Sequence, residues 1–305
     1  VSVDGLNPKA LKRLGPARTP TFHRLMRQGA FTLNARTVYE ATLTLPNHAS
    51  MLSGRRVLAR KGGHGLTRNV DVGGTVHRTA GEYVASVFDV VHDHGGSTSL
   101  YAGKDKFLLF ERTWNRQGAP DTTGADDGRA KIDRFTWRVR DRALVKRFAS
   151  EMRSAPSTFS FLHLARPDVV GHRAGFMSGA YLRAVEQTDR RLARVMRTIE
   201  SPAMAGRTTL LVTADHGGKR SHLDPTKRYA YTVPFFAWGP GVPAGAGLYG
   251  MNPAFKSPGR KRVGYARSRQ PIRNGLVVNL STGLLGLPAV SGSTLDPQQR
   301  FSVTR

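Results

Sequence analysis

The chain has 305 residues and no cysteine, which excludes disulfide bonds and thiolate zinc sites, so any bound metal must use nitrogen and oxygen ligands. Apolar residues make up 39% of the chain, which excludes a disordered or collagen-like protein and allows one large α/β domain or two small ones. The formal net charge of +26, carried mostly by arginine, would attract anionic ligands.

Strands and helices alternate along the chain. In chain order, the sequence predicts a helix at residues 21–28, a strand at 31–38, a helix at 82–92, a strand at 97–102, a basic amphipathic helix at 135–152, a strand at 158–164, a helix at 181–199, strands at 208–213 and 231–238, and a helix at 272–285. This order indicates an α/β fold with a mostly parallel central sheet and helices on both faces. No internal repeat or linker is visible, so we expect a single domain over residues 1–305.

The beginning of the chain and one polar stretch complete this description. Val1-Ser2-Val3 has the composition of the last part of a strand, so we expect that an upstream segment has been removed, and a signal peptide with it. The stretch 115–134 either covers the site or is a simple loop. No apolar run is long enough to cross a membrane, and the absence of cysteine is compatible with an oxidising compartment, so we expect a secreted or periplasmic protein without a membrane span.

Three aspartates follow predicted strands. Asp4, Asp168 and Asp215 each come just after a strand, and the carboxyl ends of parallel strands meet at one edge of a sheet. Asp215 is followed by His216 and then by two glycines, which permit the irregular backbone that brings both side chains to one ion. The alternative is an aspartate that caps the next helix, with a surface histidine beside it.

Two further histidines extend this set. His172 lies four residues after Asp168, a spacing that puts both side chains on one face of a helix, while Gly171 would let a loop fold back instead. The alternative is an N-capping aspartate and an exposed histidine. His222 is isolated, and a lone histidine usually binds nothing.

The segment Thr44-Leu45-Pro46-Asn47-His48 places a hydroxyl group directly before a proline-containing, helix-like stretch. The N-terminus of a helix favours an anionic ligand, and a bound metal would make the alkoxide of Thr44 accessible near neutral pH. Asn47, one turn later, could donate its amide to a phosphoryl oxygen. The alternative is that Thr44 is an ordinary N-cap.

Taken together, these segments resemble a known family. Asp-Gly-Leu from Asp4, Thr-Leu-Pro-Asn-His from Thr44, Pro-Asp-Val-Val-Gly-His from Pro167 and Ala-Asp-His-Gly from Ala214 look like the motifs of the type I phosphodiesterase/nucleotide pyrophosphatase branch of the alkaline phosphatase superfamily. The resemblance runs in order from Val3 to about Gly241. It implies an alkaline-phosphatase-like fold and two divalent metal ions, most commonly zinc.

The resemblance also assigns roles to individual residues. It implies that one zinc would be held by Asp168, His172 and His222, and the other by Asp4, Asp215 and His216. Thr44 would be the nucleophile bound to the second zinc, and Asn47 would steady the transferred phosphoryl group. Many family members place the last histidine far downstream, after an insertion. Here His222 follows His216 by only six positions, and no later histidine exists.

These roles predict a two-zinc phosphoric-ester hydrolase that acts on a small anionic phosphoryl substrate through a phosphothreonine intermediate. A threonine nucleophile with a partner asparagine looks more like the diesterase branch than like the phosphomonoesterases, which usually use serine, an arginine clamp and a third metal. The leaving group is decided by the shape of the pocket.

Lys104 and Lys106 favour a second activity on the same fold. They lie in Gly-Lys-Asp-Lys-Phe, and phosphonoacetate hydrolases of this superfamily have a similar Lys-Asp-Lys run whose lysines bind the substrate carboxylate. The resemblance therefore admits P–C bond cleavage, with both lysines directed at a second anionic group. The alternative is a pair of exposed loop lysines.

The net charge suggests a function of another class, a basic nucleic-acid-binding protein on a degenerate hydrolase fold. No segment has a nucleic-acid-binding motif, and the densest basic cluster, at residues 256–273, has the composition of a surface loop. The intact ligand set also argues against degeneracy, so no specific nucleic acid is expected.

Overall fold

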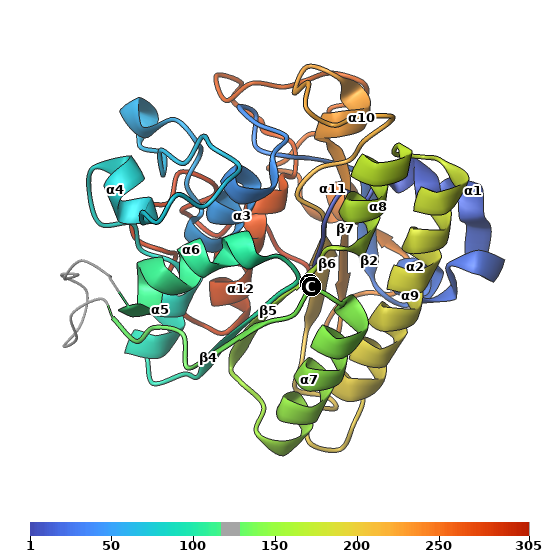
Figure 1. The fold of residues 1–305 in the computed structure, drawn as a ribbon, viewed down its shortest axis with the longest axis horizontal. Helices are drawn as coiled ribbons and strands as arrows, with labels where there is room; N and C mark the ends of the chain where they lie inside the picture. Colours follow the sequence, from blue (N-terminus) through green and yellow to red (C-terminus); the bar gives the residue numbers. More distant parts are fainter. Residues whose placement is uncertain (117–128, 305) are drawn as a thin grey trace.

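The computed structural model describes residues 1–116 and 129–304, which form an eight-stranded sheet in the order β4-β3-β5-β1-β6-β7-β2-β8 (Figure 1). The strands are β1 (Ser2–Val3), β2 (Ala30–Arg36), β3 (Thr98–Ala102), β4 (Arg134–Trp137), β5 (Phe159–Leu164), β6 (Leu210–Thr213), β7 (Thr232–Trp238) and β8 (Ala246–Gly247). Strands β4, β3, β5, β1 and β6 run parallel, whereas β7 is antiparallel to both of its neighbours, β6 and β2. The predicted mostly parallel α/β sheet is confirmed.

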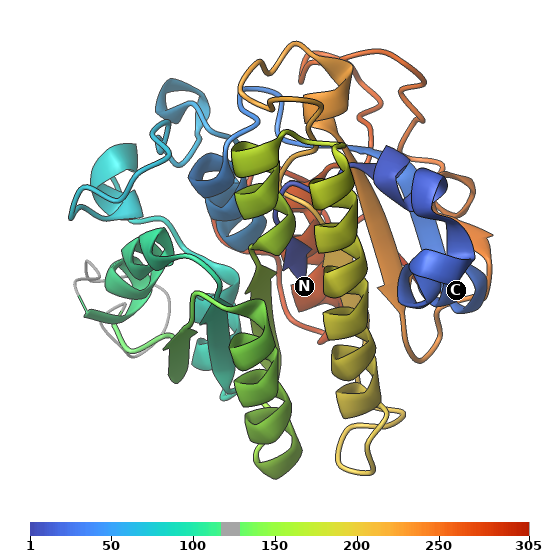
Figure 2. The ribbon, with the colours of Figure 1, turned by 45° about the vertical axis from the view of Figure 1, so that its right-hand side comes forward.

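Helices cover both faces of this sheet (Figures 1 and 2). The helices are α1 (Pro8–Arg18), α2 (Pro20–Gln28), α3 (Thr44–Ser53), α4 (Val76–Ala80), α5 (Val87–Asp93), α6 (Leu108–Glu111), α7 (Asp141–Ser154), α8 (Arg166–Ala174), α9 (Gly179–Ile199), α10 (Arg228–Tyr231), α11 (Leu248–Met251) and α12 (Val277–Leu284). On one face α9 packs against α1, α2, α7 and α8, and on the other α12 packs against α3 and α5. No helix of the described residues is long and apolar enough to cross a membrane.

Each face of the sheet has its own apolar core. Successive side chains of a strand point to opposite faces, so Leu100 and Phe161 join the core under α3 and α5. Their neighbours Tyr101 and Leu162 join the core under α7 and α9. The strands are therefore packed between two cores, which fixes where their carboxyl ends lie.

The sequence prediction was wrong at the start of the helix expected at 135–152. Residues Phe135–Trp137 belong to β4 and pair with β3, with Phe135 opposite Leu100. Aromatic and β-branched residues favour an extended backbone, and the ladder along β3 supplies the hydrogen bonds. The helix α7 begins only at Asp141.

Two other helices are shorter than expected. Helix α5 begins at Val87 instead of residue 82, because Ser86 caps it in a reciprocal capping box with Asp89. The helix expected at 272–285 consists of a 3₁₀ turn, Asn274–Leu276, followed by α12. The stretch 115–134, expected to cover the site or to be a loop, lies largely outside the described residues, because 117–128 are not described.

Candidate metal centre and active site

The carboxyl ends of three adjacent strands, β5, β1 and β6, meet at one edge of the sheet, and each leads to an aspartate. Asp4 directly follows β1, Asp168 lies in the first turn of α8 after β5, and Asp215 follows β6. Gly5 lets these segments approach. It has a φ of 69°, and a Cβ atom there would lie 3.1 Å from the Cα of Asp168. The Gly5 N–H also donates to Oδ1 of Asp215, at 3.0 Å.

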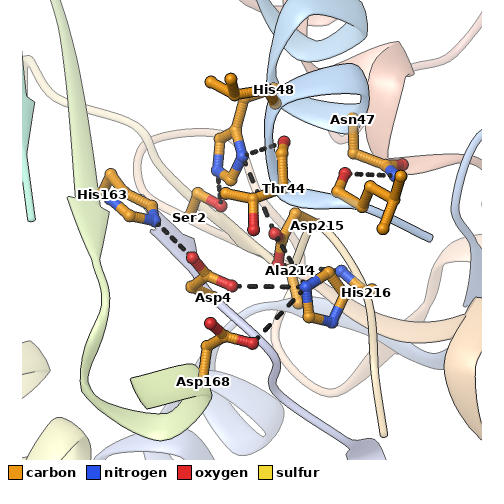
Figure 3. Close-up of polar contacts among 12 residues, drawn as sticks. Ser2, Asp4, Thr44, Asn47, His48, His163, Asp168, Ala214, Asp215 and His216 are labelled. Carbon is orange, nitrogen blue, oxygen red and sulfur yellow. Dashed lines mark hydrogen bonds and ion pairs between the residues drawn. The ribbon is translucent and has the colours of Figure 1, made fainter. Parts of the chain in front are cut away.

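Asp4, Asp215 and His216 form the first cluster (Figure 3). One ligand atom of each lies within 4.8 Å of the others, and all three side chains are fully buried. Nδ1 of His216 donates to the carbonyl oxygen of Gly217, at 2.9 Å. A carbonyl can only accept, so Nε2 of the neutral ring carries the lone pair and faces the carboxylates, 3.4 Å from Oδ1 of Asp4 and 3.3 Å from Oδ2 of Asp215.

Asp168, His172 and His222 form the second cluster, again with ligand atoms within 4.8 Å of one another. Residue 168 and residue 172 share one face of α8, and Nε2 of His172 lies 3.4 Å from Oδ1 of Asp168. His222 is buried rather than on the surface; its Nδ1 donates to the carbonyl of Thr42 at 2.7 Å, which leaves Nε2 free to face His172 at 3.0 Å. The rings of His222 and His216 stack, with centroids 3.7 Å apart, so the two clusters adjoin.

Both clusters suit divalent cations. Within the described parts of the chain, four buried atoms of these residues lack a hydrogen-bond partner: Oδ1 of Asp4, Oδ1 of Asp168, Oδ2 of Asp215 and Nε2 of His216. Leaving such an atom unsatisfied costs about 1–3 kcal/mol, and more for a charged group. Cations bound among them would satisfy all four atoms, and a nitrogen and oxygen set of this kind suits zinc, manganese or iron.

Two of these carboxylates, those of Asp4 and Asp168, contact the ammonium group of Lys104. Its Nζ lies 2.6 Å from Oδ2 of Asp4 and 2.5 Å from Oδ2 of Asp168. Burial raises the pKa of Asp4, but Lys104 and His163 outweigh it and hold that pKa well below its usual range. Burial and the carboxylates of Asp4 and Asp168 raise the pKa of Asp215 well above its usual range. Lys104 is therefore not an exposed loop lysine; its side chain is only 13% exposed.

Lys106 is half-buried and takes a different partner. Its Nζ donates to Asn69, to the backbone oxygen at 3.0 Å and to Oδ1 at 3.2 Å. Oδ1 of Asn69 also accepts from the N–H of Leu45 at the start of α3, at 3.0 Å. Lys106 thus holds Asn69, which in turn binds the first turn of α3. Its contact with a substrate stays a prediction.

Thr44 is the first residue of α3, and its side chain is buried next to Asp4 and Asp215 (Figure 3). Its reading as an ordinary N-cap is wrong, because Leu43 is the N-cap and no side chain caps the helix at that position. Asn47 lies one turn on. Its amide nitrogen donates to the carbonyls of Ala41 and Leu43, at 3.0 and 3.1 Å. Both amide hydrogens are thus engaged by the backbone, and a bond to a phosphoryl oxygen would have to share one of them.

No role was predicted from the sequence for three polar residues behind the site, Ser2, His48 and His163. Nε2 of His163 lies 3.0 Å from Oδ2 of Asp4, and its Nδ1 accepts the N–H of Gly103 at 3.2 Å, which fixes the tautomer that donates to Asp4. His48 connects Oγ of Ser2, at 2.8 Å, with the carbonyl of Thr44, also at 2.8 Å. A histidine inside an otherwise apolar strand was the available signal for His163.

Replacing His163 with leucine should weaken the binding of a divalent cation about 10- to 100-fold, because Asp4 would lose the donor that orients its carboxylate. A competition titration with a chelating dye measures this. Glutamine, whose amide can donate from a similar position, should restore part of the affinity. If the leucine variant is folded and binds the cation as tightly as the wild type, His163 only fills space.

Sequence comparison matches most of the chain to one family. The family profile described as type I phosphodiesterase / nucleotide pyrophosphatase matches residues 1–237. A venom phosphodiesterase of the cobra Naja atra is 30% identical over 83 residues, which is 26% of this chain and 10% of that protein. This chain therefore aligns with only a small part of the curated relative.

Solved structures share the fold. A mouse ectonucleotide pyrophosphatase/phosphodiesterase 5 in complex with AMP superposes with a TM-score of 0.63 at 14% identity, over 94% of both chains. The human counterpart gives 0.62 at 13% identity over the same shares. A putative sulfatase from Bacteroides thetaiotaomicron gives 0.62 at 13% identity, over 98% of this chain and 73% of its own.

Proposed function

Because the chain belongs to the type I phosphodiesterase/nucleotide pyrophosphatase family, we propose that it hydrolyses a phosphodiester or pyrophosphate bond in a small anionic substrate. The observation that carries the proposal is the meeting of two Asp/His clusters with a buried threonine at the start of α3. Names of similar proteins agree with it, since they include a venom phosphodiesterase and an ectonucleotide pyrophosphatase/phosphodiesterase.

We propose that the two clusters hold two divalent ions, and that these are zinc, which suits their nitrogen and oxygen ligands. When bound, such ions lower the pKa of a hydroxyl group and stabilise the negative charge that develops on a departing oxygen. The backbone carbonyls of Gly217 and Thr42 keep His216 and His222 in the tautomer that binds metal. The chain's own part is thus to orient ligands in a buried, preorganised site.

Thr44 is the proposed nucleophile. Its Oγ forms a bond to phosphorus while the bond to the leaving oxygen breaks, which gives a phosphothreonine; water then attacks that phosphorus and releases Thr44. Helix α3 holds the residue at its first turn, and His48 fixes the backbone there through the carbonyl of Thr44. We propose that Asn47 steadies the phosphoryl group while it secures the loop from Ala41 to Leu43.

The phosphonoacetate alternative depends on Lys104 and Lys106. Both ammonium groups already have partners, Lys104 in Asp4 and Asp168, and Lys106 in Asn69. A substrate carboxylate would have to displace these contacts, so we keep ester hydrolysis as the proposed function. Because the site suits a small phosphoryl ester, we propose no specific nucleic-acid partner. We also propose a secreted or periplasmic location, which the words "venom" and "ecto" in the names of relatives support.

A substrate screen tests the proposal. We expect the zinc-loaded protein to turn over bis-p-nitrophenyl phosphate or a nucleotide faster than p-nitrophenyl phosphate, and to show little or no cleavage of phosphonoacetate. Initial rates at matched concentrations, with metal content measured on the same sample, give the comparison. Preferential release of inorganic phosphate from phosphonoacetate would establish the P–C alternative instead. Turnover of none of the four compounds would contradict both activities.

A further inference from the structure

A pocket of about 570 Å³ lies beside α8, next to the metal clusters. It is bounded by the carboxyl end of β3, the residues that follow β4, and the first turns of α7 and α8, with α9 closing one wall. In the first turn of α8, Asp168 belongs to a metal cluster, whereas Arg166 and Val169 line the pocket. The pocket is therefore a neighbour of the candidate active site, and Lys104, which contacts Asp4 and Asp168, also lines it.

Four arginines line this pocket: Arg140, Arg142, Arg166 and Arg191. Among the described residues, none of their guanidinium groups has a hydrogen bond or an ion pair, whereas Arg112, for comparison, is paired with Asp71. Burial, and after it the charges of Arg142 and Arg190, lower the pKa of Arg191. Asp141 acts in the opposite direction and raises that pKa, so Arg191 has one carboxylate near it, while the pocket as a whole holds more arginines than carboxylates.

The pocket has fewer acidic residues than arginines. The two carboxylates are those of Asp105 and Asp141. Asp141 is buried and accepts the N–H groups of Ala165 and Arg166, at 3.0 and 3.1 Å. Asp105 accepts the N–H of Lys106 at 2.8 Å. Two carboxylates do not balance four guanidinium groups, so the pocket keeps a positive charge that favours an anion.

The pocket also has an apolar wall. Trp137, Val139 and Val169 line it and are 37%, 74% and 48% exposed, and all three are among the most exposed large apolar side chains of the described residues. An indole ring next to unpaired guanidinium groups suits a ligand with one flat apolar part and one phosphate group. An inorganic anion alone would leave this wall uncovered.

We propose that this pocket binds a phosphate-bearing aromatic ligand of the nucleotide type, with its ring on Trp137 and its phosphate among Arg142, Arg166 and Arg191. The site goes beyond the proposed hydrolysis, because its ligand need not be the group that Thr44 attacks. Two sources share this chemistry. The ligand is either a free nucleotide or the distal part of a substrate whose scissile phosphorus lies at Thr44.

Binding of ADP tests the site independently of turnover. ADP is titrated into the metal-loaded Thr44→Ala protein, in which the proposed nucleophile is absent, and followed both by calorimetry and by tryptophan fluorescence. Each guanidinium–phosphate bond contributes about tenfold or more in affinity, so the Arg142→Ala/Arg191→Ala double variant should bind ADP at least about 100-fold more weakly. Trp137→Phe should remove most of the fluorescence change, since the chain has only three tryptophans.

Arg197→Ala is the matched control, because Arg197 is an exposed residue of the same helix, α9, and does not line the pocket. It lowers the net charge without touching the site and should leave ADP affinity within about twofold. Equal ADP affinity in the wild-type background and the double variant would overturn the proposal, and so would a fluorescence change that survives Trp137→Phe. These readouts report binding and therefore require no turnover.

The two sources are then separated in proteins that retain Thr44. If the pocket holds the distal part of a substrate, the double variant should lose at least about tenfold in kcat/KM on a dinucleoside polyphosphate and keep its kcat/KM on bis-p-nitrophenyl phosphate. If the pocket holds a free nucleotide, the dinucleoside polyphosphate should be hydrolysed equally well by both proteins, and ADP should still bind tightly only to the protein with both arginines.

Discussion

Replacing Thr44 with alanine should lower kcat/KM for phosphodiester hydrolysis by about 10⁴-fold or more, because the proposed bond to phosphorus forms at its hydroxyl group. Thr44 is buried at the start of α3 and next to Asp4 and Asp215, so a water molecule in its place would lack the positioning that the helix provides. Single-turnover and steady-state assays with bis-p-nitrophenyl phosphate measure the loss.

Two controls make this result interpretable. Thr44→Ser keeps the hydroxyl and should retain measurable activity, and the metal content of Thr44→Ala should equal that of the wild type. Intact-mass measurement after rapid acid quenching should find a phosphorylated enzyme only when the hydroxyl is present. If Thr44→Ala turns over at a rate close to that of the wild type, the covalent route is wrong and water is the attacking group.

Exhaustive chelation should abolish hydrolysis and destabilise the protein. Three carboxylates crowd the site, and Oδ2 of Asp215 and Oδ1 of Asp168 are buried without a hydrogen-bond partner among the described residues. Each cation at 100 times its Kd would add about 2.7 kcal/mol to the free energy of unfolding, which is roughly 4 °C in Tm for a domain of this size. Calorimetry before and after chelation, with elemental analysis, measures both effects.

Variants that remove one metal ligand should show how much each cluster contributes to metal binding and activity. His222→Ala should reduce the bound zinc from two ions to about one and lower activity at least about 100-fold. His94→Ala, in which an imidazole outside the site is lost, is the control and should keep both ions. Full activity after chelation, or an unchanged metal content in His222→Ala, would contradict the two-metal assignment.

Much of the site was predictable because its residues occupy positions that a parallel sheet dictates. Asp4, Asp168 and Asp215 each follow a strand, and the topology brings adjacent carboxyl ends together whatever the side chains are. His172 follows Asp168 by one helical turn, so a helix is enough to bring the two side chains together. In all these cases local sequence and fold class are sufficient.

The residues that sequence reasoning missed depend on cross-strand register and on side-chain direction. His163 contacts Asp4 because Ser2 pairs with His163 across β1 and β5, and no local pattern contains that register. The pairing of Lys104 with two carboxylates depends likewise on where a long side chain turns after β3. The strand β4 was missed because its pairing with β3 outweighed a helix-like pattern of apolar residues.

The position of β1 in the sheet also has a consequence for folding. This strand lies between β5 and β6, and the backbone nitrogen of Val1 donates to the carbonyl of Leu211, 210 residues away. Contacts of such sequence separation form slowly, because the chain must close a very long loop first. On the ribosome, β1 must wait until β6 has been synthesised before it can take its place. Recovery of activity on refolding should therefore lag behind the return of helical circular dichroism, because Asp4 reaches the site only when this central strand is inserted.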